Sequence, residues 1–114
     1  MHEFSIAQEF ANAIAQEGRK AEAKRILRLE IHVGRYRAIV PETLAECLKW
    51  ILADTVAEGA EIEIVEIPVR ARCPQCDEIR EMEDLYLVCN ECGSLCPEVL
   101  SGKELLLYSM EIED

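Results

Sequence analysis

The sequence contains two Cys-x-x-Cys pairs, and the twelve residues 77–88 separate them. Cys73 and Cys76 form the first pair, and Cys89 and Cys92 form the second. Two such turns can place four thiolates at the corners of a tetrahedron, the geometry that Zn²⁺ takes in structural sites. Gly93 follows the second pair, where a tight turn around the metal needs a permissive residue. The spacing therefore predicts a zinc site.

A pair of redox-active or disulfide-bonded motifs is the alternative interpretation of the same spacing. A redox pair usually lies at the start of a helix in a βαβ unit, and neither pair has that position. A closed four-sulfur site has no open position for a substrate. No His or carboxylate completes an open zinc site near the cysteines, so we expect a structural metal and no enzyme.

The charge of the chain limits its partners. It has 114 residues, with 12 Lys and Arg against 23 Asp and Glu, which gives a net charge of −11. Such a balance repels phosphate and disfavours a nucleic-acid partner, but is compatible with a cation or a basic protein surface. The opening residues show no signal-peptide pattern, and no apolar run approaches the ~20 residues of a membrane span. Six cysteines in such a chain favour reduced thiols in the cytoplasm.

Two segments have the period of an amphipathic helix. In residues 5–17 one stripe is apolar, and Gly18 is the expected end; the stripe consists of Ile6, Ala7, Phe10, Ala11 and Ile14. Pro41 suits the first position of a second helix, which we expect to end at Gly59. On that helix Cys47 is predicted to be a small core residue and Trp50 to be half buried.

Three longer segments have the period of a strand. Residues 25–33 alternate, with Leu27, Leu29, Ile31 and Val33 on one face. In residues 60–69 the period breaks near Ile64 and Val65, as a bulge would cause. The third segment carries Leu106, Tyr108, Met110 and Ile112 in alternation. Residues 85–88 predict a short strand before the second cysteine pair, and the charged run 78–84 predicts a solvated hairpin arm or tip.

These elements predict an α/β fold with two helices packed on a three-stranded mixed sheet. The first two strands are joined through a helix and should be parallel. Residues 1–69 with 101–114 would form this domain, and residues 70–100 an inserted zinc-ribbon-like module. The apolar core of the module is too small to fold alone. Structural zinc, with an apparent binding free energy of about 10–16 kcal/mol, would supply its stability.

The amino terminus offers a second metal site. A free α-amine, a deprotonated backbone amide and an imidazole within two residues form fused chelate rings, which favour square-planar Ni²⁺ or Cu²⁺. The amine of Met1, the amide and imidazole nitrogens of His2 and the amide nitrogen of Glu3 would fill four positions. The Glu3 carboxylate could instead be an acceptor beside the metal. The alternative is a solvated histidine on a frayed chain end.

Two further residues leave alternatives open. His32 lies on the polar side of the first predicted strand, where an exposed or half-exposed side chain is favoured over a second metal ligand. Cys96 follows Cys92 by four residues. It is interpreted as a spare thiol rather than as a residue that exchanges with one of the four zinc ligands.

The motifs together resemble the HypA/HybF family, the nickel-incorporation proteins of [NiFe]-hydrogenase maturation. The similar segments, in order, are Met1–Ile6, Leu29–Ile31, Pro41–Leu44, Glu58–Ile62, both cysteine pairs with Gly93 and Ser94, and Ser101–Leu105. Each segment alone is unspecific, but the ordered set is highly specific and runs along the whole chain.

The resemblance implies a metallochaperone and not an enzyme. It implies nickel at Met1, His2 and Glu3 and structural zinc on Cys73, Cys76, Cys89 and Cys92. The implied partners are the GTPase HypB, the [NiFe]-hydrogenase large subunit and, for some members, urease maturation proteins. Members occur as monomers and as homodimers. A zinc-ribbon adaptor that binds proteins without transferring nickel is the alternative function.

The chain departs from the family pattern at two places. Family members often carry a glycine where His32 stands, and here Gly34 comes two residues later. Some archaeal members also have a long insertion between the cysteine pairs that includes a histidine able to reach nickel. The twelve residues 77–88 contain no histidine. Any further nickel ligand must therefore come from the backbone, from His32 or from another chain.

Overall fold

The structure is a computed structural model that describes residues 2–82 and 86–114. The chain divides into two compact units. The first contains residues 1–32, 39–65 and 105–114, and the second contains residues 33–38 and 66–104. The boundary falls inside two long strands, β1 (Arg25–Gly34) and β2 (Glu61–Ile67). None of the helices within the described ranges is long and apolar enough to cross a membrane.

Helix α1 (His2–Lys20) begins and ends outside the predicted range. Ala7, Phe10 and Ile14 form the buried stripe that the period predicted. Gly18 was expected to end the helix, which is wrong, because the helix continues past it. A Cβ atom at Gly18 would lie 3.2 Å from Ile26 Cδ1, so the glycine permits close packing. The chain leaves the helix at Glu22, whose φ of 52° is left-handed.

Helix α2 (Pro41–Leu52) has Pro41 in its first turn, as predicted, and buries Leu44, Leu48 and Leu52. It ends at Leu52 rather than at Gly59. The Thr55 hydroxyl donates a 2.6 Å hydrogen bond to the Leu52 carbonyl and so satisfies one of the last helical acceptors. Trp50 is 80% exposed, so the prediction of a half-buried tryptophan is wrong.

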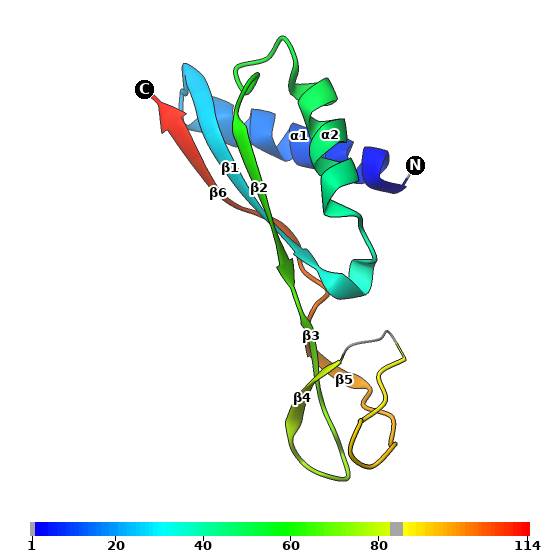
Figure 1. The fold of residues 1–114 in the computed structure, drawn as a ribbon. Helices are drawn as coiled ribbons and strands as arrows, with labels where there is room; N and C mark the ends of the chain where they lie inside the picture. Colours follow the sequence, from blue (N-terminus) through cyan, green and yellow to red (C-terminus); the bar gives the residue numbers. More distant parts are fainter. Residues whose placement is uncertain (1, 83–85) are drawn as a thin grey trace. The chain divides into compact units, whose positions relative to one another are not determined.

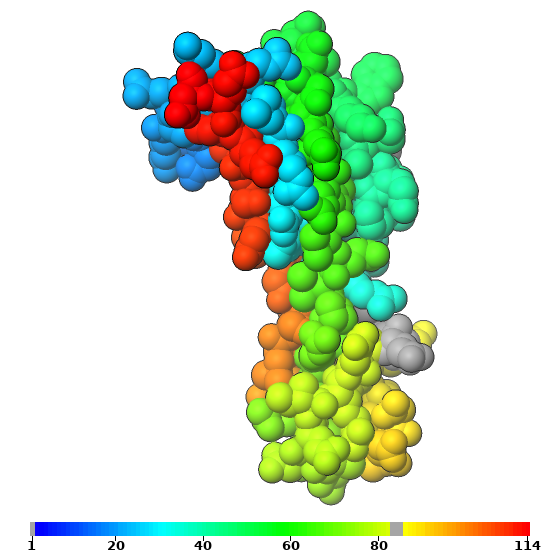
Figure 2. Space-filling model, turned by 60° about the vertical axis from the view of Figure 1, so that its left-hand side comes forward, coloured from blue at the N-terminus to red at the C-terminus, as the bar shows by residue number. Residues whose placement is uncertain are grey.

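The sheet of the first unit contains β1, β2 and β6 (Leu105–Glu113) in the order β2-β1-β6. In Figure 1, β1 and β2 run in the same direction and β6 runs in the opposite direction, which confirms the mixed sheet. Figure 2 shows the three strands as adjacent red, cyan and green stripes. The helices α1 and α2 pack on this sheet, so the predicted α/β architecture is confirmed.

Strand β1 follows its predicted alternation with one exception. Leu29, Ile31 and Val33 are buried. Leu27 was expected on the same face, but it is 46% exposed, whereas its neighbour Ile26 is buried. The register of buried residues therefore changes at the start of the strand, where the Ile26 side chain packs against Gly18 of α1.

The second unit contains a short 3₁₀ helix, η1 (Arg35–Arg37), and three short strands. These strands are β3 (Val69–Arg72), β4 (Ile79–Met82) and β5 (Glu98–Ser101), and both β4 and β5 pair antiparallel with β3. The predicted single strand 60–69 is in fact two elements, because β2 ends at Ile67 and β3 begins after Pro68. Proline lacks the N–H that would continue the ladder.

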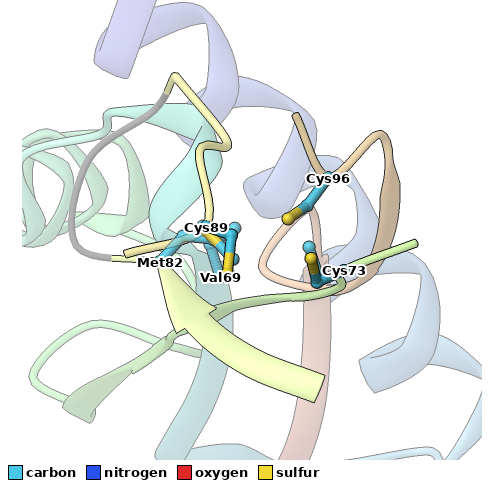
Figure 3. Packing of buried hydrophobic residues seen from close by; sticks show 6 residues of the cluster. Val69, Cys73, Met82, Cys89 and Cys96 are labelled. Carbon is cyan, nitrogen blue, oxygen red and sulfur yellow. The ribbon is translucent and has the colours of Figure 1, made fainter. Parts of the chain in front are cut away.

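The core of the second unit is small and rich in sulfur. Its buried residues are Val69, Ala71, Cys73, Met82, Cys89 and Cys96, and Figure 3 shows their side chains, with all but Ala71 labelled. The charged run 78–84 was expected to be a solvated arm, but it contains the buried Met82. Residues 83–85, including the start of the predicted strand 85–88, lie outside the described residues. Within 86–88, only Val88 forms a bridge, with Leu95.

Candidate metal centre

The two Cys-x-x-Cys segments form turns with the same hydrogen bonds. The Cys73 carbonyl accepts from the N–H of Asp77 at 2.8 Å, and the Cys73 N–H donates to the Glu78 carbonyl at 2.9 Å. In the second turn the Cys89 carbonyl accepts from Gly93, and the Cys89 N–H donates to Ser94. The fourth residue after the first cysteine is left-handed in both turns, with φ of 55° at Asp77 and 78° at Gly93. Gly93 thus has the permissive role predicted for it.

The repeated turn brings the four cysteines together. The Sγ atoms of Cys73, Cys76, Cys89 and Cys92 all lie within 4.8 Å of one another. Cys73 Sγ and Cys92 Sγ are 3.5 Å apart, much farther than the ~2.05 Å of a disulfide. Four sulfurs around zinc at ~2.3 Å would be about 3.8 Å apart. The four-cysteine cluster therefore fits a tetrahedral metal ion of this size.

The thiols of the cluster differ in their acidity. Hydrogen bonds from Ser94 lower the pKa of Cys92 to about 6. A hydrogen bond with Cys92 raises the pKa of Cys76 to about 12. Backbone N–H groups of Cys92 and Glu91 lower the pKa of Cys89. A metal ion must displace the proton of a thiol such as Cys76, which makes metal binding dependent on pH.

Cys96 lies in the same core but outside the four-cysteine cluster. It is fully buried, and its Sγ lies 3.7 Å from the Ser94 carbonyl oxygen. Burial raises the pKa of its thiol, which favours the neutral form. This environment agrees with the interpretation of Cys96 as a spare thiol that packs beside the metal site. In the described ranges, the cluster is the one group of three or more His, Cys, Asp or Glu side chains that could hold a metal.

The residues predicted for the nickel site lie in the first unit, and Met1 lies outside the described residues. His2 is exposed and is the first residue of α1. Glu3 is half buried, and its carboxylate accepts a 3.1 Å hydrogen bond from the Val40 N–H. The Ser5 hydroxyl donates to the His2 carbonyl at 3.1 Å. These contacts thus hold the backbone carbonyl of His2 and the side chain of Glu3.

His32 is held by two neighbours in the first unit. Its Nε2 lies 2.7 Å from a carboxylate oxygen of Glu30. Its ring stacks on Tyr108 of β6, with a centroid distance of 4.1 Å and an angle of 11° between the planes. The side chain is 17% exposed, so His32 is more buried on its strand than the exposed or half-exposed residue that was favoured.

Comparisons with known proteins agree along the whole chain. A family model described as "Hydrogenase/urease nickel incorporation, metallochaperone, hypA" matches residues 1–112. The hydrogenase maturation factor HypA of Chlorobium limicola is 39% identical over 114 residues, which cover 100% of this chain and 98% of that protein. The HypA of Nostoc punctiforme is 34% identical over 114 residues, covering 100% and 97%.

Solved structures of similar proteins share the fold. The solution structure of the nickel metallochaperone HypA from Helicobacter pylori superposes with a TM-score of 0.68 at 25% identity, covering 98% of this chain and 97% of that one. A second solution structure, of a HypA protein, gives a TM-score of 0.70 at 24% identity, covering 99% and 97%. At that identity the second likeness supports the fold alone.

Proposed function

Because the chain belongs to the HypA family of hydrogenase and urease nickel-incorporation metallochaperones, we propose that it binds Ni²⁺ at its amino terminus and delivers it to the [NiFe]-hydrogenase large subunit. The proposed ligands are the amine of Met1, the imidazole and amide nitrogens of His2, and the amide nitrogen of Glu3. The GTPase HypB is the proposed partner in this transfer, and urease maturation proteins are a further candidate.

The start of α1 at His2 is the observation that carries the nickel proposal. The first four N–H groups of a helix have no partner inside the helix. The amide nitrogens of His2 and Glu3 belong to this set, so a metal can replace their protons without breaking a helical hydrogen bond. The exposed imidazole of His2 is on the same residue. These nitrogens are the donor type that square-planar Ni²⁺ prefers.

The hydrogen bond between Glu3 and Val40 assigns separate roles to the two ends of Glu3. The carboxylate is engaged with the backbone of Val40, which precedes α2. The backbone N–H of Glu3 has no carbonyl partner within the helix, and its hydrogen bond to its own carboxylate also lowers the pKa of that carboxyl. We therefore propose the amide nitrogen as the fourth nickel ligand, with the carboxylate holding the first turn in place.

The two proposed sites offer different donor atoms, so each site favours a different metal ion. Thiolates arranged as a tetrahedron suit Zn²⁺, whereas the proposed planar set of four nitrogens suits Ni²⁺. The four cysteine sulfurs fit zinc in number and spacing, and we propose that zinc has a structural role in the second unit. Nickel is the cargo, and it would be held at an exposed chain end.

The proposed position of nickel at the amino terminus also suggests how the ion is released. Ligands of an acceptor protein can approach an exposed terminal site directly, so nickel can pass by ligand exchange without becoming a free ion. Nickel binding also requires the amine and the imidazole to lose their protons. Acid should therefore weaken nickel binding.

The replacement His2→Ala tests the site, with His32→Ala as its matched control. Each change removes one imidazole, but His32 is engaged with Glu30 and Tyr108. We expect His2→Ala to abolish stoichiometric nickel binding in a calorimetric titration, while the zinc content and circular dichroism stay unchanged. His32→Ala should bind nickel like the native chain. The opposite result for the two variants would move the site to His32.

A further inference from the structure

Arg80 lies on the inner face of the small sheet in the second unit. Side chains on a strand alternate between its two faces. In β4 the side chains of Ile79 and Glu81 are exposed, whereas Arg80 is half buried and Met82 is buried. Arg80 therefore shares a face with Met82, a member of the sulfur-rich core. Its partner across the ladder is Ala71, which is fully buried in the same core.

Only some of the N–H donors of the Arg80 guanidinium are bonded to a carboxylate. Its Nη2 donates to a carboxylate oxygen of Glu78 at 3.0 Å. Its Nε is buried and has no hydrogen-bond partner among the residues that the structure describes. Unsatisfied buried donors are rare in folded proteins, and each one requires an explanation. An acceptor on the same face of the sheet would supply that explanation.

The thiols of Cys76 and Cys89 are the available acceptors. Hydrogen bonding with the Cys76 thiol is the largest cause that raises the pKa of Arg80, and Cys89 contributes through its charge and a hydrogen bond. Cys76 belongs to the first cysteine turn and Cys89 to the second. The face of β4 that carries Arg80 and Met82 lies against the same core, in which Cys89 is buried and against which Cys76 packs.

The charge of the zinc-loaded cluster would strengthen a hydrogen bond from Arg80 to a cysteine sulfur. Four thiolates around one Zn²⁺ carry a net charge of −2, and a thiolate accepts hydrogen bonds more strongly than a thiol. The two arginines of β3, Arg70 and Arg72, lie on the face opposite Val69 and Ala71. Arg70 pairs with Glu81, and Arg72 pairs with Asp77 and Glu98. Arg80 is the cation of β3 and β4 that lies on the cluster side.

We propose that Arg80 is a positioning residue of the metal site, which donates N–H···S hydrogen bonds to the thiolates of Cys76 and Cys89 and slows the loss of zinc. The guanidinium offsets part of the negative charge and makes both thiolates poorer nucleophiles. It also holds one sulfur of each turn close to the other before metal enters. This inference rests on the proposed zinc occupancy of the four-cysteine cluster.

The test compares Arg80→Gln with Arg70→Gln in the full-length, zinc-loaded chain. Both variants lose one positive charge from the same unit, but Arg70 faces away from the cluster. Zinc transfer to a chromophoric chelator is followed after addition of a thiol-alkylating reagent. Loss of a residue that orients metal ligands typically costs 10–100-fold in affinity, so we expect about tenfold faster release from Arg80→Gln. Release from Arg70→Gln should match the native chain.

A spectroscopic measurement separates ligand tuning from a general loss of stability. Cobalt(II) replaces zinc in the cluster and shows sulfur-to-metal charge-transfer bands. A thiolate without a hydrogen-bond donor gives up electron density more easily, so these bands should shift to longer wavelength in Arg80→Gln. The bands of Arg70→Gln should stay at their native position. A purely structural role for Arg80 would leave the band positions unchanged.

Arg80→Lys provides the second variant. Lysine keeps the charge but lacks the rigid fork that reaches two acceptors, so we expect a release rate between those of the native chain and Arg80→Gln. If Arg80→Gln does not hold stoichiometric zinc, faster-than-native release from Arg80→Lys supports the proposal. Equal release from Arg80→Lys and the native chain would overturn it.

Two failures are distinguishable in this experiment. A native chain that binds no zinc would overturn both the zinc assignment and the role of Arg80. A native chain with one zinc, and with the same release rate and cobalt spectrum in the native, Arg80→Gln and Arg70→Gln forms, would overturn the role of Arg80 alone.

Discussion

The Glu3 carboxylate accepts a 3.1 Å hydrogen bond from the backbone N–H of Val40. Val40 is the N-cap residue of α2, and no side-chain cap hydrogen bond comes from Val40 itself. The first turn of α1 thus contributes to the ordering of the chain just before α2. This contact is also the largest cause that lowers the pKa of Glu3. A substitution at the amino terminus can therefore change the hydrogen bonding at the start of α2.

Replacement of Glu3 should loosen the start of α2. In Glu3→Ala the Val40 N–H loses its acceptor, so we expect faster hydrogen exchange at the Val40 amide. Glu3→Gln keeps an oxygen acceptor and should have a smaller effect. Exchange measured by NMR on the metal-free protein tests this, with Glu9→Ala as a control at an exposed position of the same helix. Unchanged exchange at Val40 in Glu3→Ala would contradict the contact.

The same contact predicts a pH dependence in the metal-free protein. The pKa of Glu3 is lowered from its ordinary value of 4.5, chiefly by the Val40 N–H. A group with a lowered pKa in the folded state stabilises the fold fully above its unfolded pKa, and this contribution is lost as pH falls through the folded pKa. The Val40 amide proton resonance should therefore titrate with a midpoint below 4.5. A midpoint at or above 4.5 would contradict the shift.

Gly34 allows two backbone segments of the second unit to approach. Its N–H donates to the Glu104 carbonyl at 2.7 Å, and a Cβ atom at this position would lie 2.0 Å from the Gly102 carbonyl oxygen. Backbone atoms cannot move away as a flexible side chain can. We therefore expect Gly34→Ala to lower the free energy of unfolding by about 3 kcal/mol, as in overpacked cores. Urea denaturation of the zinc-loaded protein measures this change.

Gly59→Ala is the matched control for Gly34→Ala. Gly59 has a φ of +79°, but a Cβ atom there would meet nothing within 4 Å. The left-handed backbone alone should cost about 1 kcal/mol. If Gly34→Ala costs no more than Gly59→Ala, the close approach to Gly102 is not a determinant of stability.

Removal of one zinc ligand should affect the second unit selectively. Cys73→Ser would lose the apparent zinc binding free energy of about 10–16 kcal/mol that stabilises small metal modules. We expect the NMR resonances of residues 69–104 to lose their dispersion, while the helical circular dichroism of α1 and α2 persists. Cys47→Ser replaces a thiol outside the cluster and should keep both zinc and fold. A zinc-free Cys73→Ser variant with native dispersion would contradict the structural role.

The sequence predicts best those features that depend on local patterns. The cysteine spacing predicts the cluster of four sulfurs, and each Cys-x-x-Cys turn is closed by its own backbone hydrogen bonds. The apolar periods likewise predict both helices and the long strands of the mixed sheet. The stripe of Ala7, Phe10 and Ile14 is buried because it repeats at helical spacing.

Features that depend on a distant partner could not be predicted in the same way. Gly18 has the usual identity of a helix end, but its role is set by Ile26, which packs against it. The hydrogen bond from Val40 to Glu3 joins residues 37 positions apart. Arg80 stood within a charged run that predicted solvent exposure. Its alternation with Met82 was the available signal, but a four-residue strand is too short to establish the period.

Nickel titration of the untagged, zinc-loaded chain, beside a version with one extra residue before Met1, decides whether the amino-terminal amine binds nickel. The extension moves the α-amine out of the proposed chelate while every side chain remains. We predict one Ni²⁺ per chain for the native form in calorimetry, and lost or much weaker binding for the extended form. Equal nickel binding by the two forms would contradict the amino-terminal site.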